Sequence, residues 1–196
     1  MAIIIEKIKQ LRQETGFSLA ECKNAMEEAG GDIEKAKKIL NQKETKIAGK
    51  RSERATKQGI ITSYIHSNKK VGVLLDLRCE TDFVARGEEF NNLAHELCLQ
   101  IAAMKPIYVK AEDIPEEFVD GETKIYKEQF KDSGKPQKII DQIIEGKLNK
   151  YKEEVSLMSQ LWIKDDTKTI KDLINQYIAK IGENIVINKF NYYEVI

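Results

Sequence analysis

Residues 71–90, VGVLLDLRCETDFVARGEEF, decide the predicted fold, because a strand pattern changes into a helix pattern within them. The first part alternates, which predicts a strand with one face on a core. Its inward residues are Val71, Val73, Leu75 and Leu77. From about Glu88 apolar residues recur every three or four positions, which predicts a helix. The corner between the two, Cys79–Ala85, holds an acidic residue and a phenylalanine side by side.

Two interpretations of this corner remain open at the level of sequence. A large aromatic side chain at a strand-to-helix corner is either packed or presented to a partner. In the first interpretation, Asp82 caps the following helix and Phe83 packs beneath it. In the second, Phe83 is a contact residue for another molecule. The choice between them decides what kind of function the corner has.

The first forty residues predict three short helices that form a small domain over residues 1–41. The second helix is expected to turn one face inward, comprising Leu19, Cys22, Met26 and Ala29. Gly30 and Gly31 are expected to end it, since glycine adopts the left-handed conformation that helix ends require. Asp32 is expected to cap the third helix. A bundle this small buries little surface.

Residues 42–57 are predicted to be a basic linker or a solvated helix. They carry six basic residues against two acidic ones, and Ile47 is their single large apolar residue. A basic run can bind phosphates, but this one has neither interleaved aromatic residues nor a nucleic-acid-binding motif. A solvated segment is therefore the favoured interpretation.

Residues 58–196 are predicted to form an α+β core. Strands at 60–65 and 71–77 flank a polar hairpin loop, and 185–195 predicts a third strand. A helix is expected to start at Thr169 and to end at Gly182. Residues from about 116 to 158 predict a projecting antiparallel helical hairpin with a turn at 132–136, its apolar residues packed between the two helices. The fold class is thus three helices, then a three-stranded antiparallel sheet packed with helices and this hairpin.

Composition narrows the class of protein. The formal net charge is zero, so no overall field favours nucleic acid or an anionic membrane. The three cysteines are widely spaced and odd in number, which favours reduced, buried thiols over a disulfide framework. The first residues are charged too soon for a signal peptide. No apolar run approaches the roughly 20 residues that a membrane helix needs. We expect a cytoplasmic protein that binds neither nucleic acid nor membranes directly.

The motifs of the common enzyme classes are missing from the sequence. It has no phosphate-binding G-x-x-x-x-G-K-[ST], no G-x-G-x-x-G after a strand, no G-x-S-x-G and no H-E-x-x-H. The two histidines, His66 and His95, lack an obvious acidic or cysteine partner. We therefore expect no catalytic residue, no bound metal and no cofactor, and a function based on binding rather than on chemistry of its own.

Three separated blocks of the sequence carry a further signal: Thr15–Lys23 with Glu27–Ala36, Glu80–Ala85, and Ile181–Val186. In their order and spacing these blocks resemble the bacterial elongation factor Ts family, and the resemblance extends over essentially the whole chain. The first block looks like the family's ubiquitin-associated-like amino-terminal domain, the second like its core signature and the third like its carboxy-terminal block. The length is similar to the short form of the family, in which two copies are thought to pair.

This resemblance implies a nucleotide exchange factor for the GTPase elongation factor Tu. It implies that Thr81, Asp82, Phe83 and Val84 dislodge the Mg²⁺ ion of that GTPase, with the Asp82-Phe83 pair as a wedge beside the magnesium site. It also implies that the amino-terminal domain contacts the GTPase through Arg12, Leu19, Ala20 and Lys23. The pairing of two copies implies a homodimer and a 2:2 complex with the GTPase.

One alternative is an interaction adaptor without exchange activity. Three-helix domains of the ubiquitin-associated type can bind ubiquitin-like proteins, and such an adaptor would use the first domain alone. It would not need the rest of the chain in this form, which favours the exchange factor.

Overall fold

The computed structural model describes residues 2–17, 19–131, 133–134 and 136–195. It comprises two compact units. The first is built from Met1–Ile60, Leu77–Leu93 and Asp172–Val186, and the second from Ile61–Asp76, Ala94–Lys171 and Ile187–Ile196. Both helices and strands are present, as the sequence predicts. No helix in the described ranges combines the length and the apolar character that crossing a membrane requires.

Three helices at the start of the first unit pack around a common core. They are α1 (Ala2–Thr15), α2 (Leu19–Glu28) and α3 (Ile33–Arg51). The buried core residues are Ile8, Leu11, Cys22, Ala25, Met26, Ala36 and Leu40. The predicted end of α2 is confirmed, since Gly30 and Gly31 have left-handed φ angles of 63° and 84°. Asp32 caps α3 by accepting hydrogen bonds from the backbone N–H groups of Glu34 and Lys35.

Helix α3 extends ten residues beyond the predicted small domain. Of the two possibilities for residues 42–57, the helical one holds as far as Arg51. The extension has a buried side, because Glu44 and Ala48 are buried four residues apart. The boundary of the small domain at residue 41 remains a prediction, since the first compact unit runs across it.

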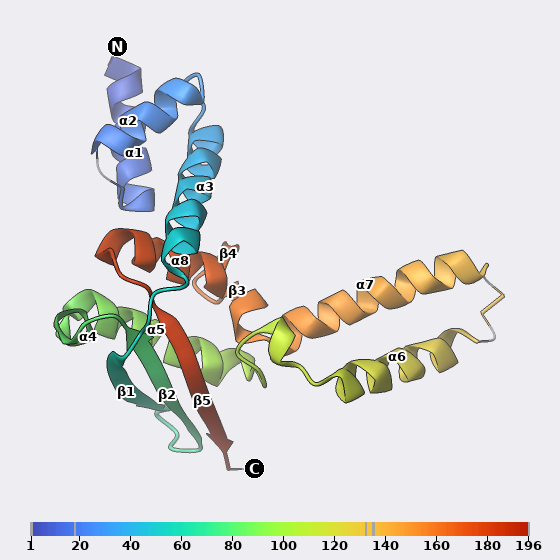
Figure 1. The fold of residues 1–196 in the computed structure, drawn as a ribbon. Coiled ribbons are helices and arrows are strands. Elements are labelled where there is room, and N and C mark those ends of the chain that lie inside the picture. Colours follow the sequence, from blue (N-terminus) through green and yellow to red (C-terminus); the bar gives the residue numbers. More distant parts are fainter. Residues whose placement is uncertain (1, 18, 132, 135, 196) are drawn as a thin grey trace. The chain divides into compact units, whose positions relative to one another are not determined.

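The sheet has three strands in the order β1-β2-β5 (Figure 1). Their bounds are Gln58–Ile65, Val71–Cys79 and Val186–Glu194. Strands β1 and β2 form the predicted hairpin, closed by a hydrogen bond of 2.9 Å from the His66 N–H to the Val71 carbonyl. At the far end of β5, the Val195 N–H donates to the Lys70 carbonyl at 2.8 Å. Because Lys70 precedes β2, strand β5 runs antiparallel to β2.

One face of β2 is buried, as its alternation predicts. Val73, Leu75 and Leu77 are buried, whereas Leu74 is exposed. Asp76 belongs to the other face but is also buried, and its carboxylate accepts a hydrogen bond of 2.8 Å from the Asn188 side-chain amide on β5. A cross-strand polar pair thus replaces water around this acid.

Helix α5 (Glu88–Met104) follows the predicted stripe closely. Phe90, Leu93, Leu97 and Ile101 are fully buried, but Met104 is half exposed at the end of the helix. Gln100, on the same helix, is also fully buried. Its side chain donates to the Leu161 carbonyl at 3.0 Å and accepts from the Ile163 N–H at 2.9 Å. It thereby satisfies the backbone of a small hairpin that the sequence analysis did not predict, β3 (Leu161–Trp162) with β4 (Asp165–Thr169).

Helices α6 (Glu116–Phe130) and α7 (Gln137–Val155) pack side by side as the predicted helical pair (Figure 1). Of the predicted turn, Asp132 and Lys135 lie outside the described residues. Lys147 on α7 crosses to α6, where its ammonium group lies 5.1 Å from the centroid of the Tyr126 ring. The prediction that the apolar residues of these two helices pack against each other is wrong in part. Ile144 is buried, but Phe118, Ile125 and Ile139 are exposed.

The final helix is also confirmed. Helix α8 (Ile170–Ile181) buries Ile170, Leu173 and Ile174, and Gly182 ends it with a φ of 89°. All three cysteines are buried and free, in agreement with the prediction of reduced thiols.

The two glycine conformations in the three-helix bundle predict opposite effects of alanine. Gly31→Ala places a side chain at φ 84°, and this should lower the free energy of unfolding by about 1–2 kcal/mol. Gly49→Ala lies in helix α3 with no atom within 4 Å of the new Cβ, so it should raise that free energy by about 0.5 kcal/mol. Urea unfolding followed by circular dichroism measures both. Shifts of the same sign in the two variants would contradict this account.

Candidate functional site at the strand-to-helix corner

Phe83 stands at the surface of the corner that follows β2. Its side chain is 85% exposed, the largest exposed fraction among the large apolar residues of the described chain. It belongs to the short helix α4 (Asp82–Arg86), which the sequence analysis did not predict, since it expected a helix from about Glu88. The interpretation that Phe83 packs beneath the following helix is therefore wrong.

Thr81, and not Asp82, caps helix α4. The Thr81 hydroxyl accepts the Val84 N–H at 3.4 Å, with Thr81 itself in an extended conformation. Asp82 instead forms an ion pair of 3.1 Å with Arg86, one turn along the helix and exposed on both sides. Such a pair contributes little stability. The Asp82 carboxylate and the Phe83 ring therefore both face solvent, as a contact site for another molecule requires.

Hydrogen bonds at the end of α4 hold the corner against α5. The Gly87 N–H donates to the Val84 carbonyl at 2.9 Å. The Asn91 side-chain amide donates to the carbonyls of Ala85 and Gly87, at 3.2 and 2.8 Å. Ala85 is buried, whereas Phe83 is exposed, so α4 turns its alanine inward and its phenylalanine outward.

Hydrogen bonds from the carboxy-terminal block hold the start of the corner. The Glu183 carboxylate accepts from the Thr81 hydroxyl at 2.6 Å and from the backbone N–H groups of Thr81 and Glu80, at 3.0 and 3.1 Å. In return, Glu80 accepts from the Asn184 N–H at 2.7 Å. Two of the blocks that carry the family resemblance, 103 residues apart in the chain, are thus bound to each other.

Cys79 is the first residue of the corner. Its thiol is buried and donates to the Thr81 carbonyl at 3.2 Å. Burial raises the pKa of the Cys79 thiol to about 11, and the nearby Glu183 carboxylate contributes to the rise. The thiol therefore stays protonated near neutral pH, where a protonated thiol is a poor nucleophile.

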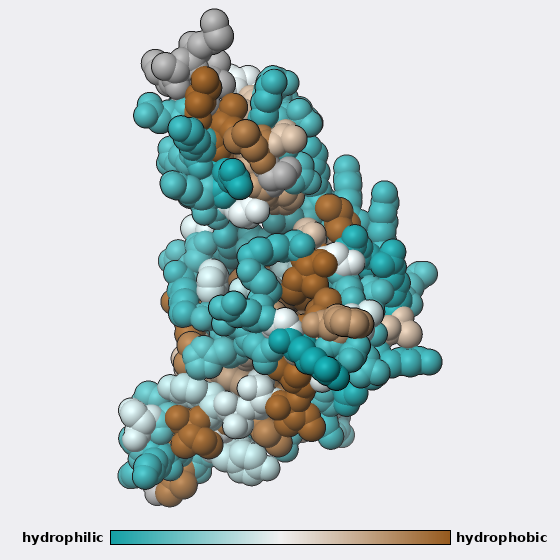
Figure 2. Space-filling view, turned by 90° about the vertical axis from the view of Figure 1, so that its left-hand side faces the viewer, coloured by the Kyte–Doolittle hydropathy of each residue, from teal (hydrophilic) through white to brown (hydrophobic). Residues whose placement is uncertain are grey.

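The predicted contact residues of the small domain are all exposed. Arg12 lies in the last turn of α1, and Leu19, Ala20 and Lys23 lie on α2. Leu19 is 54% exposed, so its predicted place on the inner face of α2 is wrong. Cys22, Ala25 and Met26 form that inner face instead. Figure 2 shows apolar side chains at the surface of the bundle among hydrophilic ones.

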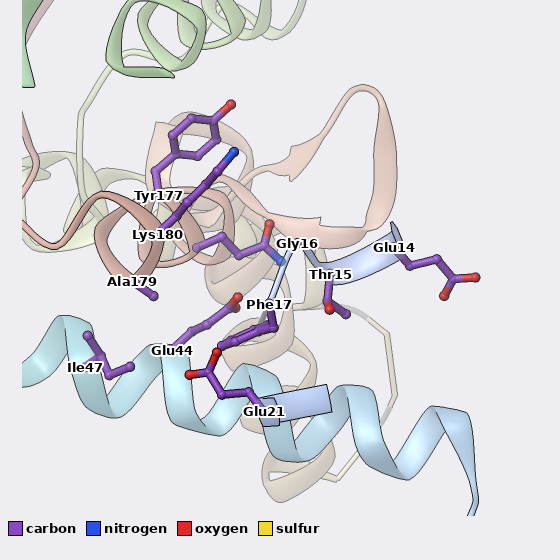
Figure 3. Close-up of a pocket in the computed structure, with 11 residues that line it drawn as sticks. Glu14, Thr15, Gly16, Phe17, Glu21, Glu44, Ile47, Tyr177, Ala179 and Lys180 are labelled. Carbon is purple, nitrogen blue, oxygen red and sulfur yellow. The ribbon is translucent and has the colours of Figure 1, made fainter. Parts of the chain in front are cut away.

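A hollow of about 410 Å³ in the first unit was not foreseen from the sequence. Phe17, Glu21 and Glu44 line one wall, and Tyr177 and Lys180 of α8 line the other (Figure 3). Lys180 also forms an ion pair of 2.8 Å with Glu89. The hollow holds none of the residues of the corner, and we assign no function to it.

Comparison with known proteins decides the family. The family model described as elongation factor TS matches residues 3–177. The chain belongs to the elongation factor Ts family. An elongation factor Ts from Thermotoga petrophila is 53% identical over 195 residues, which cover 100% of this chain and 97% of the relative. Those from Thermosipho melanesiensis and Coprothermobacter proteolyticus are 52% and 51% identical, over 93% and 97% of the chain.

Membership of the elongation factor Ts family makes the chain a translation elongation factor with the general role of a nucleotide exchange factor. The match to the Thermotoga petrophila protein covers 100% of this chain, so the exposed corner and the small domain both lie in the shared region. Membership of a family does not assign roles to individual residues, so the roles of Thr81–Val84 and of the small-domain residues remain predictions.

Sequence reasoning missed the residues that support the corner. Asn91, Glu183 and Asn184 have polar side chains that form hydrogen bonds to backbone groups of other elements or turns. The sequence does single out two of these residues, because Glu183 and Asn184 lie in the third block that resembles the elongation factor Ts family. That block identified the family, but its bonding partners became visible only in the fold.

The buried Cys79 thiol predicts slow chemical modification. At pH 8 its raised pKa keeps it protonated in the folded protein, so iodoacetamide should alkylate it at least about tenfold more slowly than in urea. Mass spectrometry of the peptide that contains Cys79 measures the rate. Equal rates with and without urea would show that the corner is open in solution.

Proposed function

We propose that this chain promotes GDP release from elongation factor Tu by inserting Asp82 and Phe83 beside the Mg²⁺ site of that GTPase. The observation that carries the proposal is the 85% exposure of Phe83 on a corner held by hydrogen bonds at both ends. An aromatic side chain kept in water costs free energy unless a partner buries it. Thr81 and Val84 flank the pair and complete the proposed contact.

The chemistry of nucleotide release fits such an intrusion. In a GTPase the Mg²⁺ ion neutralises the phosphates of the nucleotide and bridges them to the protein. Displacing the ion leaves phosphate charge uncompensated, which weakens the bound nucleotide. The chain needs no catalytic residue of its own for this, because it changes an equilibrium and a barrier in its partner.

The energy required shows that Phe83 does not act alone. Burying one phenylalanine yields roughly 1.5–3 kcal/mol. Moving a partner from almost entirely closed to almost entirely open takes about 5.5 kcal/mol of differential affinity. The remainder must come from a wider interface, for which the exposed Arg12, Leu19, Ala20 and Lys23 are the proposed contacts. Linkage also requires that nucleotide weaken the binding of this chain by the same factor.

We further propose that the chain pairs with a second copy through the open face of its sheet, giving a 2:2 complex in the cytoplasm. A groove of about 480 Å³ runs over this face, lined by residues of all three strands and the segments beside them. Ile65 and Tyr193 are each 63% exposed along it. Figure 2 shows further hydrophobic side chains at the surface outside the bundle. Apolar residues from three neighbouring strands suit a second sheet packed face to face.

Truncating the exposed ring tests the proposed wedge. Phe83→Ala should lower the maximal rate of GDP release from elongation factor Tu by at least about tenfold, because the contact beside the Mg²⁺ site is lost. Release of a fluorescent GDP analogue, followed by stopped flow at saturating exchange factor, measures the rate. Since Phe83 is not part of the core, the free energy of unfolding should stay within about 0.5 kcal/mol of the wild type.

Ile107→Ala is the matched control, because Ile107 is also largely exposed but belongs to the second unit and not to the corner. It should leave release unchanged. Equal acceleration by the wild type and Phe83→Ala would remove Phe83 from the mechanism. A wild-type protein that fails to accelerate release, or that captures a ubiquitin-like protein in place of the GTPase, would overturn the proposed function.

A charge on the open sheet face tests the pairing. Ile65→Asp should convert the wild-type dimer into a monomer, because a carboxylate would be buried at the interface. Sedimentation velocity at micromolar concentration measures this. Ile107→Asp adds the same charge off the sheet and should remain dimeric. A wild-type chain that sediments as a monomer, alone and with its GTPase, would contradict the pairing.

A further inference from the structure

Glu183 is a partly buried acid whose carboxylate is hydrogen-bonded to the corner. It follows Gly182, whose left-handed conformation ends α8 and turns the chain toward the corner. Its carboxylate accepts three hydrogen bonds from two consecutive residues of the corner, Glu80 and Thr81. A carboxylate that accepts two consecutive backbone N–H groups fixes the orientation of that peptide, and charge-assisted bonds of this kind are among the stronger ones.

The direction of Phe83 depends on this peptide. Helix α4 has five residues, too few for a helix to be stable by itself. Its own cap is weak, since the Thr81 hydroxyl lies 3.4 Å from the Val84 N–H. The same hydroxyl donates to Glu183 at 2.6 Å, which is a much closer bond. Glu183 therefore supplies the fixed point from which α4 starts.

The turn that carries Glu183 is itself held on several sides. The Asn184 side-chain amide donates to the carbonyls of Ser52 and Arg54, at 3.3 and 2.9 Å, just beyond the end of α3. The Arg51 guanidinium donates to the Ile178 carbonyl in the last turn of α8, at 3.1 Å. Asn184 is buried. The turn that carries Glu183 is thus fixed by α3, α8 and the segment after α3. Through the hydrogen bonds of Glu183, this turn also fixes the position of the corner.

We propose that Glu183 is a positioning residue for nucleotide exchange, which acts through Thr81 to hold Phe83 in the direction that its partner requires. This inference rests on the proposed function for the role of Phe83, but its structural part stands separately. The Ile181–Val186 block therefore has a second role besides ending α8, because it fixes the direction of the exposed Phe83 ring.

Glu183→Ala tests the proposal, because two quantities should respond differently: the limiting rate of GDP release and the concentration of exchange factor that gives half-maximal acceleration. The limiting rate of GDP release at saturating exchange factor should fall about tenfold, because the ring is presented in many directions. The concentration for half-maximal acceleration should change less than threefold, because the small-domain contacts are untouched. A variant that merely unfolds in part would show the opposite, a raised half-saturation with the limiting rate unchanged.

Three further variants make the test specific. Glu183→Gln keeps one side-chain oxygen for the backbone N–H groups and should recover part of the limiting rate. Glu89→Ala removes an acid that also pairs with α8, through Lys180, and should have no effect. In a Phe83→Ala background, Glu183→Ala should cause no additional loss, since the residue acts through that ring.

Amide hydrogen exchange supplies a readout that does not depend on the partner. The N–H groups of Glu80 and Thr81 should exchange slowly in the wild type and at least about tenfold faster in Glu183→Ala. Unchanged exchange at these amides would overturn the proposal. An unchanged limiting rate, in a series where Phe83→Ala does lower it, would also overturn it. If the wild type fails to accelerate release, the proposed function falls, and the exchange rates still decide whether Glu183 holds the corner.

Discussion

The bond between the Glu183 carboxylate and the Glu80–Thr81 backbone is the constraint on which the functional surface depends. It joins two segments that are 103 residues apart and closes the end of the sheet where β2 leaves and β5 enters. Without it, α4 would be held at its far end alone, by Asn91, and the entropy of so short a segment would spread the exposed Phe83 ring over many directions. A binding surface gains affinity when such freedom is removed before the partner arrives.

Elsewhere in the fold, too, some apolar residues are buried and stabilise the structure, whereas others are exposed and available to a partner. Helix α5 buries its stripe from Phe90 to Ile101, and Gln100 satisfies backbone groups of the β3–β4 hairpin from within. Most of the exposed large apolar residues lie on the corner, the small domain, the sheet and the helical pair, although Met104, Ile107, Leu161 and Ile163 lie elsewhere. A translation factor whose role is to change the state of a partner needs several such surfaces. No single one yields enough free energy.

The sequence predicts regular elements well where periodicity is long and glycine marks the ends. The stripe from Phe90 to Ile101, the stop at Gly30-Gly31 and the Asp32 cap all occur as expected. Prediction fails where one element depends on another far away in the chain. The β3–β4 hairpin has no alternation long enough to detect, and α6 leaves apolar residues outside that helical spacing assigns to packing. In the corner, periodicity could not choose between a packed and an exposed Phe83, because the hydrogen bonds that hold the corner come from side chains outside it, Glu183 and Asn91.

The position of the Phe83 ring in the complex is the most direct test of the account. A photoreactive phenylalanine derivative can be placed at position 83 and cross-linked to elongation factor Tu, with the product mapped by mass spectrometry. The account predicts cross-links to residues that surround the Mg²⁺ and phosphate site of the GTPase, and their loss when GDP and Mg²⁺ are in large excess. Cross-links confined to a distant surface of the GTPase, or equal yields with and without the nucleotide, would contradict it.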